Sequence, residues 1–260
     1  MTGKIKGTGS YIPVQVWDND KLSHMMDTSD EWIRGRTGIG QRHIASGEET
    51  VSYMAAKAGE AALAAAKMKP EEIDLILVST MSAEKIMPCA ACEVQKLLGA
   101  VHATCFDLNG ACTGFLLALN TAQAYLGGRI YRTALVIGAE ALSHLTNWQD
   151  RSTCVLFGDG AGAVVLEADP SAVYVQATHS IGNGGGALTC ASRNQPGFAE
   201  ENADFTPTYM QMDGKEVFKF AARMVPKSIN KVLDEAGVSK EEIKYFVLHL
   251  SLIHISEPTR

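Results

Sequence analysis

The stretch from Thr104 to Phe115 places a cysteine where a strand pattern gives way to a helix pattern. Residues 104–108 form an apolar strand pattern, and an Ala- and Leu-rich helix pattern covers 113–126. Cys112 would lie near backbone N–H groups that have no partner within the helix and near the positive end of the helix dipole. Both effects favour the thiolate, so we expect its pKa to fall from about 8.5 toward neutrality. The alternative is that Cys112 is an ordinary small buried residue.

Apolar strand patterns alternate with helix patterns along the chain. The predicted strands are 4–10, 73–79, 102–108, 132–139, 153–156, 161–167 and 173–178. The predicted helices are 18–26, 29–36, 50–68, 88–98, 113–126 and 214–236, with Asp18 and Ser29 as the N-caps of the first two. This alternation predicts an α/β fold with a largely parallel sheet that is covered on both faces. Residues 153–156 and 161–167, which flank a Gly-Asp-Gly turn, are expected to form a hairpin-like pair.

Two segments that lie 170 positions apart resemble each other. Residues 69–78 and 239–248 each contain Glu-Glu-Ile followed by an apolar run that is predicted to be a strand, and each follows a long helix pattern. The repetition indicates an internal duplication of an α/β unit, although a chance likeness of two short connections remains open. If the duplication is real, His249 corresponds to Ser79. Both residues would then stand at the carboxyl end of a parallel strand, where open α/β sheets place functional groups.

The composition limits the classes of protein to which the chain can belong. The net charge of −6 argues against general nucleic-acid binding. No apolar stretch approaches the roughly 20 residues that cross a bilayer, and the N-terminus lacks the apolar run of a signal peptide. We therefore expect a cytoplasmic location.

The six cysteines are expected to be free thiols, because they are scattered through strand and helix patterns. Cys89 and Cys92 form a C-x-x-C motif that has no second pair and no histidine cluster nearby. We interpret the two as neighbours on one helix, with metal binding or redox use as the alternative. No metal site is predicted elsewhere.

The last eleven residues, 250–260, have the sequence expected from translating a transposase mosaic end and a sequencing adapter. We expect this tail to be non-native and the coding sequence to stop at His249. The first half continues with several strands after its matching strand, whereas the second half has none. The chain is therefore expected to be truncated.

Four ordered motifs identify a family that the chain resembles. They are 28–33 (TSDEWI) with 36–39 (RTGI), 109–115 (NGACTGF), 156–163 (LFGDGAGA) and 214–220 (GKEVFKF). From about Gly3 to His249 the chain resembles the β-ketoacyl-acyl carrier protein synthase III enzymes of the thiolase superfamily. The resemblance implies a thiolase-like α/β fold made of two pseudo-duplicated halves in a layered αβαβα arrangement, with the second half incomplete. We expect the halves at 1–168 and 169–249, followed by the tail at 250–260.

The resemblance also implies a reaction without a cofactor. An acyl group, expected to be acetyl, would pass from coenzyme A to Cys112 as a thioester. Malonyl-acyl carrier protein would then lose carbon dioxide and attack that thioester, giving a 3-oxoacyl-acyl carrier protein. The family uses a histidine and an asparagine as hydrogen-bond donors to the developing enolate. His249 matches the histidine, whereas the asparagine and a later glycine-rich loop have no counterpart here.

The family's binding residues transfer to particular positions of this sequence. Trp32 matches the tryptophan that stacks on the adenine of coenzyme A, and Arg36 and Arg151 match arginines that hold its nucleotide end. Thr28 matches a residue of the same pocket. Without the resemblance, Trp32 would more often be a core residue.

Three further positions concern partners in the family. Met87 occupies the position of a residue that reaches into the acyl pocket of the partner subunit of a homodimer. Its flexible side chain leaves the chain-length preference open. Lys215 and Lys219 lie where the family presents positive charge to the acidic carrier protein, and a plain solvated helix face is equally compatible with them.

Other functions are weighed against this one. Residues 158–163 fit a loose dinucleotide-binding fingerprint, but that motif needs a helix directly after it, and 164–166 has a strand pattern. Hydroxymethylglutaryl-coenzyme A synthases and ketosynthases of secondary metabolism also use a cysteine and a histidine. The chain as written could also be an inactive fragment of the synthase.

Overall fold

The computed structural model describes residues 1–191 and 209–249, which divide into two compact units. Unit 1 comprises Met1–Trp17, Arg42–Ser143 and Gly158–Tyr174. Unit 2 comprises Asp18–Gln41, His144–Phe157 and the described residues from Val175 onward. The predicted boundary between residues 168 and 169 falls inside Gly158–Tyr174, the last segment of unit 1. The division into halves at 1–168 and 169–249 therefore stays a prediction. The expected tail, 250–260, lies outside the described residues.

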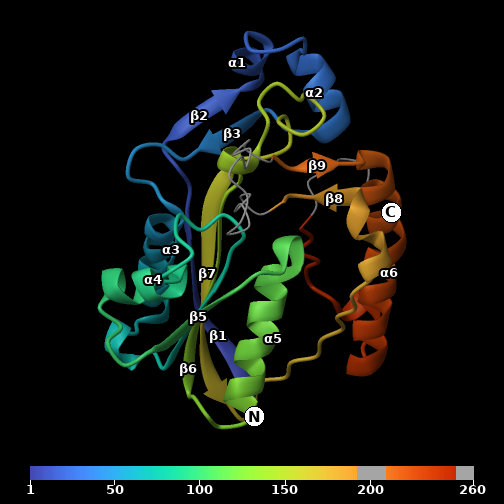
Figure 1. Cartoon of the computed structure of the whole chain (residues 1–260). Helices are drawn as coiled ribbons and strands as arrows, with labels where there is room; N and C mark the ends of the chain where they lie inside the picture. The colour runs from blue at the N-terminus through green and yellow to red at the C-terminus, as the bar shows by residue number, and fades with distance from the viewer. Residues whose placement is uncertain (192–208, 250–260) are drawn as a thin grey trace, which may run out of the picture. The chain divides into compact units, whose positions relative to one another are not determined.

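Unit 1 is built on a five-stranded sheet with the order β1-β7-β6-β4-β5 (Figure 1). Its strands are β1 (Thr2–Tyr11), β4 (Leu75–Ser79), β5 (Thr104–Leu108), β6 (Thr133–Ala141) and β7 (Asp159–Asp169). β4 is parallel to β5 and β6, while β7 is antiparallel to both β6 and β1. The sheet is therefore mixed rather than largely parallel. β7 can run back along β6 because the connection between them is not a crossover helix.

Helices cover both faces of this sheet (Figure 1). α3 (Val51–Ala66) and α4 (Ala90–Leu98) lie on one face, and α5 (Gly114–Gly127) lies on the other. The fully buried strand β4 serves both cores: Ile76 and Val78 join the α3 and α4 side, and Leu75 and Leu77 join the α5 side. Burying each such side chain contributes about 1.5–3 kcal/mol. The central layers of the expected fold are thus present in unit 1.

Two glycines allow β1 to approach α3 closely. A Cβ atom on Gly7 would overlap the backbone of Ala66, and one on Gly9 would overlap the backbone of Ala62. Glycine is the one residue type that brings the strand this near the helix, so the GTG segment of β1 fixes the packing of α3 on the sheet.

Unit 2 contains short helices, turns and one long helix. α1 (Asn19–Ser23) and α2 (Asp30–Thr37) begin at the predicted caps, Asp18 and Ser29, whose side chains accept N–H groups of the first turn. The other elements are the pair β8 (Leu188–Thr189) and β9 (Gln211–Met212), the 3-10 helix η4 (Gly182–Ala187) and α6 (Gly214–Ala236). β2 (Gln15–Asp18) pairs with β3 (Gln41–Ile44) where the chain passes between the units, and η3 is Leu142–Leu145.

The two related segments begin alike. The 3-10 helices η1 (Pro70–Glu72) and η5 (Lys240–Glu242) each have a capping box, in which the carboxylate of Glu72 or Glu242 accepts the N–H of Lys69 or Ser239 at 2.7 and 2.8 Å. Each follows a long helix that ends in a left-handed residue. The predicted repetition is therefore present at the level of local structure.

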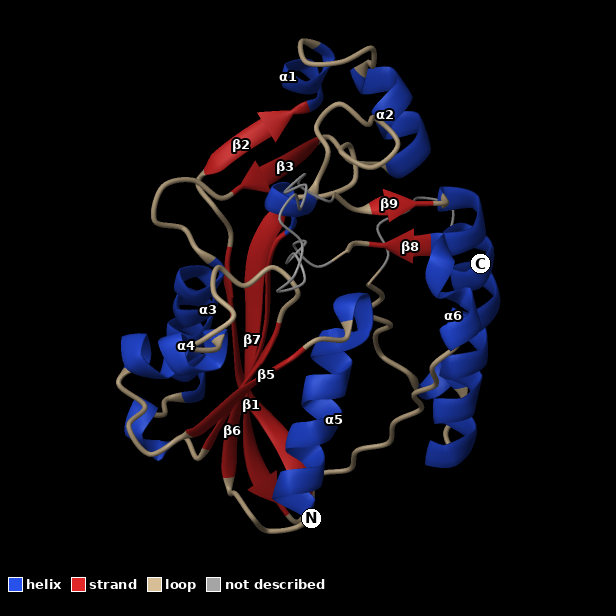
Figure 2. Ribbon diagram, viewed as in Figure 1, coloured by secondary structure: helices blue, strands red, loops and turns tan. Residues whose placement is uncertain are grey.

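The segments then diverge, and three predicted strands are wrong. Residues 153–156 form turns, so they make no hairpin with β7. Residues 173–178 form loop (Figure 2), and 243–248 are also not a strand. A strand needs a neighbouring strand to accept its backbone groups, and 243–248 has none in the described part of the chain. Tyr245 and Val247 are consequently exposed, at 74% and 94% of their surface.

Candidate active site

Cys112 lies on the turn that joins β5 to α5. The 3-10 helix η2 (Ala111–Thr113) occupies this turn, and the Thr113 N–H and hydroxyl both donate to the Gly110 carbonyl, at 3.1 and 3.0 Å. Ala111 has a φ of +45°, which is unusual for a residue that has a Cβ atom. Such strain is found at functional sites, where surrounding structure maintains it. Cys112, the residue that follows Ala111, is exposed.

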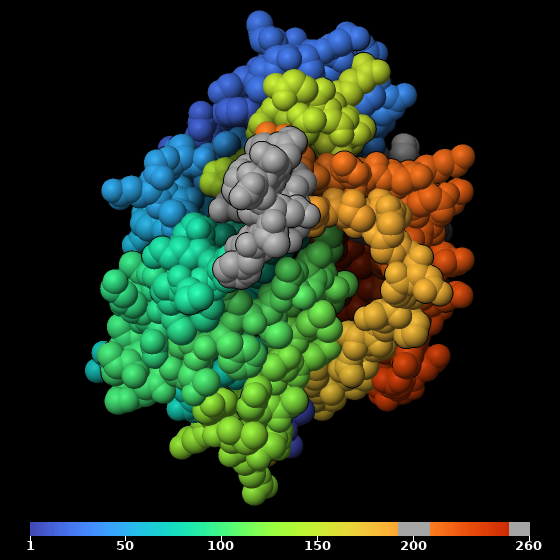
Figure 3. Space-filling view, viewed as in Figure 1, coloured from blue at the N-terminus to red at the C-terminus, as the bar shows by residue number. Residues whose placement is uncertain are grey.

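Two glycines make the turn sterically possible. A Cβ atom on Gly110 would come within 2.6 Å of Leu117 Cδ1, and one on Gly114 would overlap the hydroxyl of Ser79 at the end of β4. The turn therefore presses against the carboxyl ends of the parallel strands. Figure 3 shows the α5 segment, in green, at the surface of unit 1, and Leu116 of that helix is exposed.

The pKa of Cys112 differs from the expected one. Although the residue as a whole is exposed, the protein atoms around its sulfur partly remove water from the thiol. This desolvation raises its pKa above the usual value, and the negative charge of Glu140 raises it further. A hydrogen bond from the residue's own backbone N–H lowers the pKa, as the position at a helix start predicts, but the effect is smaller. The prediction of a depressed pKa is therefore wrong for this structure, since the desolvation of the thiol outweighs the nearby N–H groups.

Glu140 is a functional candidate that sequence reasoning missed. It follows the buried part of β6, and its carboxylate accepts the Met81 N–H at 3.0 Å, the Thr80 hydroxyl at 3.4 Å and the Ser82 hydroxyl. Burial raises the pKa of this carboxyl even though these donors lower it. The available signal was an acidic residue directly after a buried strand, at the same sheet edge as Ser79 and Cys112.

Unit 2 brings together three residues predicted for coenzyme A binding. The guanidinium carbon of Arg36 lies 4.5 Å from the centroid of the Trp32 ring, and that of Arg151 lies 5.1 Å from it. Arg151 also donates to the Asp27 carbonyl at 2.8 Å, which orients its side chain. Thr28 lies nearby in sequence, and its buried hydroxyl has no hydrogen-bond partner among the described residues. An aromatic face flanked by two cations can hold an adenine ring and phosphates.

The remaining predicted site residues are exposed. Met87 lies on the loop before α4 and exposes 82% of its surface. Lys215 and Lys219 lie on the first turns of α6, where Lys219 forms an ion pair with Glu216 at 2.7 Å. His249 is exposed and belongs to unit 2, whereas Cys112 belongs to unit 1. His249 does not stand at the end of a strand, contrary to the prediction.

The Gly-Asp-Gly motif has a structural role. The carboxylate of Asp159 accepts the Ala45 N–H at 2.7 Å, the Ser143 N–H at 2.9 Å and the Ser143 hydroxyl at 2.7 Å. Residues 164–166 continue as strand β7, as predicted. A dinucleotide-binding motif requires a helix directly after its glycines, and here a strand follows instead, which argues against that alternative.

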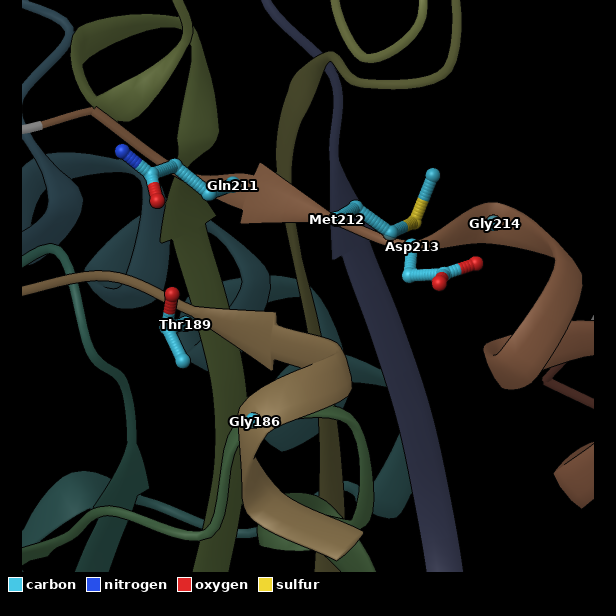
Figure 4. A pocket seen from close by; sticks show the side chains of 6 residues that line it. All are labelled: Gly186, Thr189, Gln211, Met212, Asp213 and Gly214. Atoms are coloured by element: carbon cyan, nitrogen blue, oxygen red, sulfur yellow. The ribbon is translucent and has the colours of Figure 1, made fainter.

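The described surface also has shallow hollows in unit 2. One of about 520 Å³ lies between β8, β9 and the start of α6 (Figure 4). Its lining residues are Gly186, Thr189, Gln211, Met212, Asp213 and Gly214. A second, of about 550 Å³, includes Asn147, Cys190 and Tyr209. Neither is lined by Cys112 or Trp32, so we do not assign the chemistry to them.

Residues 1–191 and 209–249 contain no group of three or more acidic, cysteine or histidine side chains placed to hold a metal ion, and no helix long and apolar enough to span a membrane.

Comparison with known proteins gives a consistent set of relatives. Residues 106–184 match the family described as 3-oxoacyl-[acyl-carrier-protein (ACP)] synthase III. The chain is 45% identical over 255 residues to the β-ketoacyl-[acyl-carrier-protein] synthase III of Clostridium acetobutylicum, covering 98% of this chain and 78% of that protein. It is also 45% identical over 250 residues to the synthase III of Synechococcus elongatus, covering 94% and 74% respectively.

Solved structures agree with these relatives. The crystal structure of 3-oxoacyl-[acyl-carrier-protein] synthase III from Aquifex aeolicus matches with a TM-score of 0.83 at 41% identity, covering 93% of this chain and 74% of that one. The corresponding synthase III from Pseudomonas aeruginosa matches with a TM-score of 0.88 at 35% identity, covering 98% and 77%.

Proposed function

Because this chain belongs to the β-ketoacyl-acyl carrier protein synthase III family, we propose that it catalyses the initiating condensation of fatty-acid synthesis. In the first half-reaction the Cys112 sulfur attacks the thioester carbonyl of an acyl-coenzyme A, expected to be acetyl-coenzyme A. Coenzyme A leaves as a thiol, and the acyl group remains on Cys112. In the second, malonyl-acyl carrier protein loses carbon dioxide and its carbanion takes that acyl group. The proposal places this reaction in the cytoplasm and assigns it no cofactor.

The position of Cys112 is the observation that carries this proposal. Cys112 is exposed on the strained turn between β5 and α5, next to Ala111, whose φ is positive. A substrate can therefore reach it. The raised pKa means that the resting thiol is protonated at neutral pH and must lose its proton before attack.

The cluster formed by Trp32, Arg36 and Arg151 supports coenzyme A as the acyl donor. The indole face and the guanidinium groups of Arg36 and Arg151 offer a stacking surface and positive charge within one compact unit. Adenine and phosphate need these two kinds of group. The role of Thr28 in this pocket rests on its buried, unpaired hydroxyl.

Partner recognition is proposed from exposed groups. Lys215 and Lys219 would meet the acidic carrier protein, with Lys219 exchanging its ion pair with Glu216. β5 is an edge strand of the sheet, so it can add to β5 of a second copy and form a homodimer. The exposed Met87 would then contribute to the acyl pocket of the other subunit.

An inactive fragment is the second candidate, and the exposure of residues 245–248 favours it. His249 follows this unpaired segment, so its side chain lacks the support that a sheet would give to an enolate-stabilising donor. On this alternative, acyl transfer is weak or absent and condensation fails. Another condensing enzyme is also compatible, since a priming β-ketosynthase of the R1128 polyketide pathway matches at 31% identity with a TM-score of 0.79.

Two separate assays test the proposal. The purified chain is incubated with radiolabelled acetyl-coenzyme A and analysed by intact-mass spectrometry for one acetyl group on Cys112, with Cys112→Ser as the control. Condensation is then followed with malonyl-acyl carrier protein. Labelling together with condensation supports the complete reaction, and labelling without condensation supports the half-reaction alone. Failure of both, with recovery in a full-length relative, supports the fragment alternative.

A further inference from the structure

Cys89 and Cys92 form a thiol pair that the proposed function does not use. Cys89 is the N-cap residue of α4, and Cys92 lies on the first turn of that helix. The Sγ atoms of Cys89 and Cys92 share a hydrogen bond at 3.5 Å. Both residues are partly exposed. The sulfur atoms would have to approach by only about 1.5 Å to reach the length of a disulfide bond.

The surrounding structure holds this pair in place. The two carboxylate oxygens of Asp107 on β5 accept the N–H groups of Ala90 and Ala91, each at 2.8 Å. The start of α4 is thereby fixed to the sheet. Lys85 forms an ion pair with Glu93 at 2.9 Å, which ties the preceding loop to the same turn. The two thiols therefore meet on an anchored turn and not on a free loop.

A third thiol nearby is chemically different. Cys105 on β5 is near enough to Cys89 and Cys92 for their charges to raise its pKa, and burial is the larger cause, bringing that pKa to about 12. Its thiol therefore stays protonated across the physiological range and is a poor nucleophile. The pKa of Cys92 is also raised, first by the hydrogen bond with Cys89. Cys105 is therefore excluded as a rival of the hydrogen-bonded pair.

We propose that Cys89 and Cys92 are a redox-active dithiol that small-molecule disulfides oxidise to an intramolecular disulfide. The thiolate of one cysteine of the pair attacks one sulfur of the disulfide, whose S–S bond breaks and whose other half leaves as a thiolate that takes up a proton. The second cysteine then loses its proton and attacks the protein sulfur that carries the adduct, releasing the second small thiol. The two protein thiols are oxidised, and one small disulfide is reduced to two thiols. The bond closes at the base of the loop that carries Met87.

The test uses the full chain carrying Cys112→Ser, because the exposed Cys112 thiol would otherwise react. The protein is equilibrated in buffers of oxidised and reduced glutathione, quenched by alkylation and digested with trypsin after denaturation. Cleavage after Lys85 and Lys96 places Cys89 and Cys92 on one peptide, 86–96, whereas Cys105 lies on 97–129. We expect peptide 86–96 to lose both alkylation sites and two hydrogen masses as the buffer becomes more oxidising, and to recover both on reduction.

Single variants test whether both cysteines are needed for the disulfide. Cys92→Ser should trap a glutathione adduct on Cys89, and Cys89→Ser should trap one on Cys92, since neither variant has a second thiol to displace it. Cys105→Ser is the matched control and should behave like its parent, with circular dichroism reporting that each variant is folded. A crosslink between peptides 86–96 and 97–129, or stable adducts on the intact pair without a disulfide, would overturn the proposal.

Discussion

The guanidinium carbon of Arg36 lies 4.5 Å from the centroid of the Trp32 ring, one turn further along α2. Arg151, from a segment more than a hundred residues later, approaches the same ring at 5.1 Å. A cation over an indole face at this distance is favourable, and both rigid groups remain available to a ligand. The arrangement therefore joins a stacking surface and two positive charges at one place in unit 2.

Replacing Trp32 with alanine should weaken the binding of coenzyme A. Loss of a stacking surface costs about 1–3 kcal/mol, so the dissociation constant should rise roughly 5- to 150-fold. Isothermal titration calorimetry with coenzyme A measures this directly and does not require an active enzyme.

Arg34→Ala provides the matched control for that measurement. Arg34 lies on the same helix, but it pairs with Asp30 at 2.8 Å. Its removal should leave the affinity for coenzyme A within about twofold, since exposed ion pairs contribute little. Equal losses of affinity in both variants would show that the loss comes from a general disturbance of α2 and not from removal of the stacking surface.

Cys112→Ser should abolish formation of the acyl-enzyme, because a serine hydroxyl on this turn has no comparable nucleophilicity at neutral pH. The readout is the labelled protein after incubation with radiolabelled acetyl-coenzyme A. Cys154→Ser is the control, since that buried thiol contacts Met26 and should not carry label. Label that persists in Cys112→Ser would refute Cys112 as the nucleophile.

Glu140→Gln should lower the pKa of the Cys112 thiol, because it removes a negative charge that raises that pKa. The thiolate is the reactive form, so the pH profile of iodoacetamide alkylation should move to lower pH. In the parent protein the profile should lie above that of a free cysteine, with reactivity rising as the pH increases.

Glu140→Asp is the control for that shift, since it keeps the charge while changing the contacts with Ser82 and Met81. Its alkylation profile should stay close to that of the parent. Should both variants move the profile equally, the effect would come from rearrangement of the 80–82 loop and not from charge.

Local patterns and resemblance were enough to predict most of unit 1. In unit 1, the helix start at Thr50 and the buried strand β4 follow from short-range chemistry and are confirmed, as are the caps Asp18 and Ser29 in unit 2. The thiolase-like α/β fold is confirmed by the solved relatives. The direction of β7 was not predictable from composition, because it depends on which neighbour the strand finds after a long connection.

The site shows the same division between local and distant effects. The turn at Cys112 was predictable from its glycines, but its pKa was not, since burial and the charge of Glu140 come from packed neighbours distant in the sequence. Residues 243–248 have an apolar pattern like that of β4, but they do not form a strand. β4 differs in that it lies between two parallel neighbours, β5 and β6, and is fully buried. A pattern predicts a strand only where partners exist to pair with it.

Asp107→Ala should destabilise unit 1 by removing both acceptors at the start of α4. The N–H groups of Ala90 and Ala91 would lose partners at 2.8 Å, and the loss of a helix cap costs about 1 kcal/mol. Differential scanning calorimetry should show the melting temperature falling by about 2–4 °C. Asp107→Asn keeps one acceptor oxygen and should recover part of this loss. An unchanged melting temperature in Asp107→Ala would show that these two bonds do not stabilise the helix start.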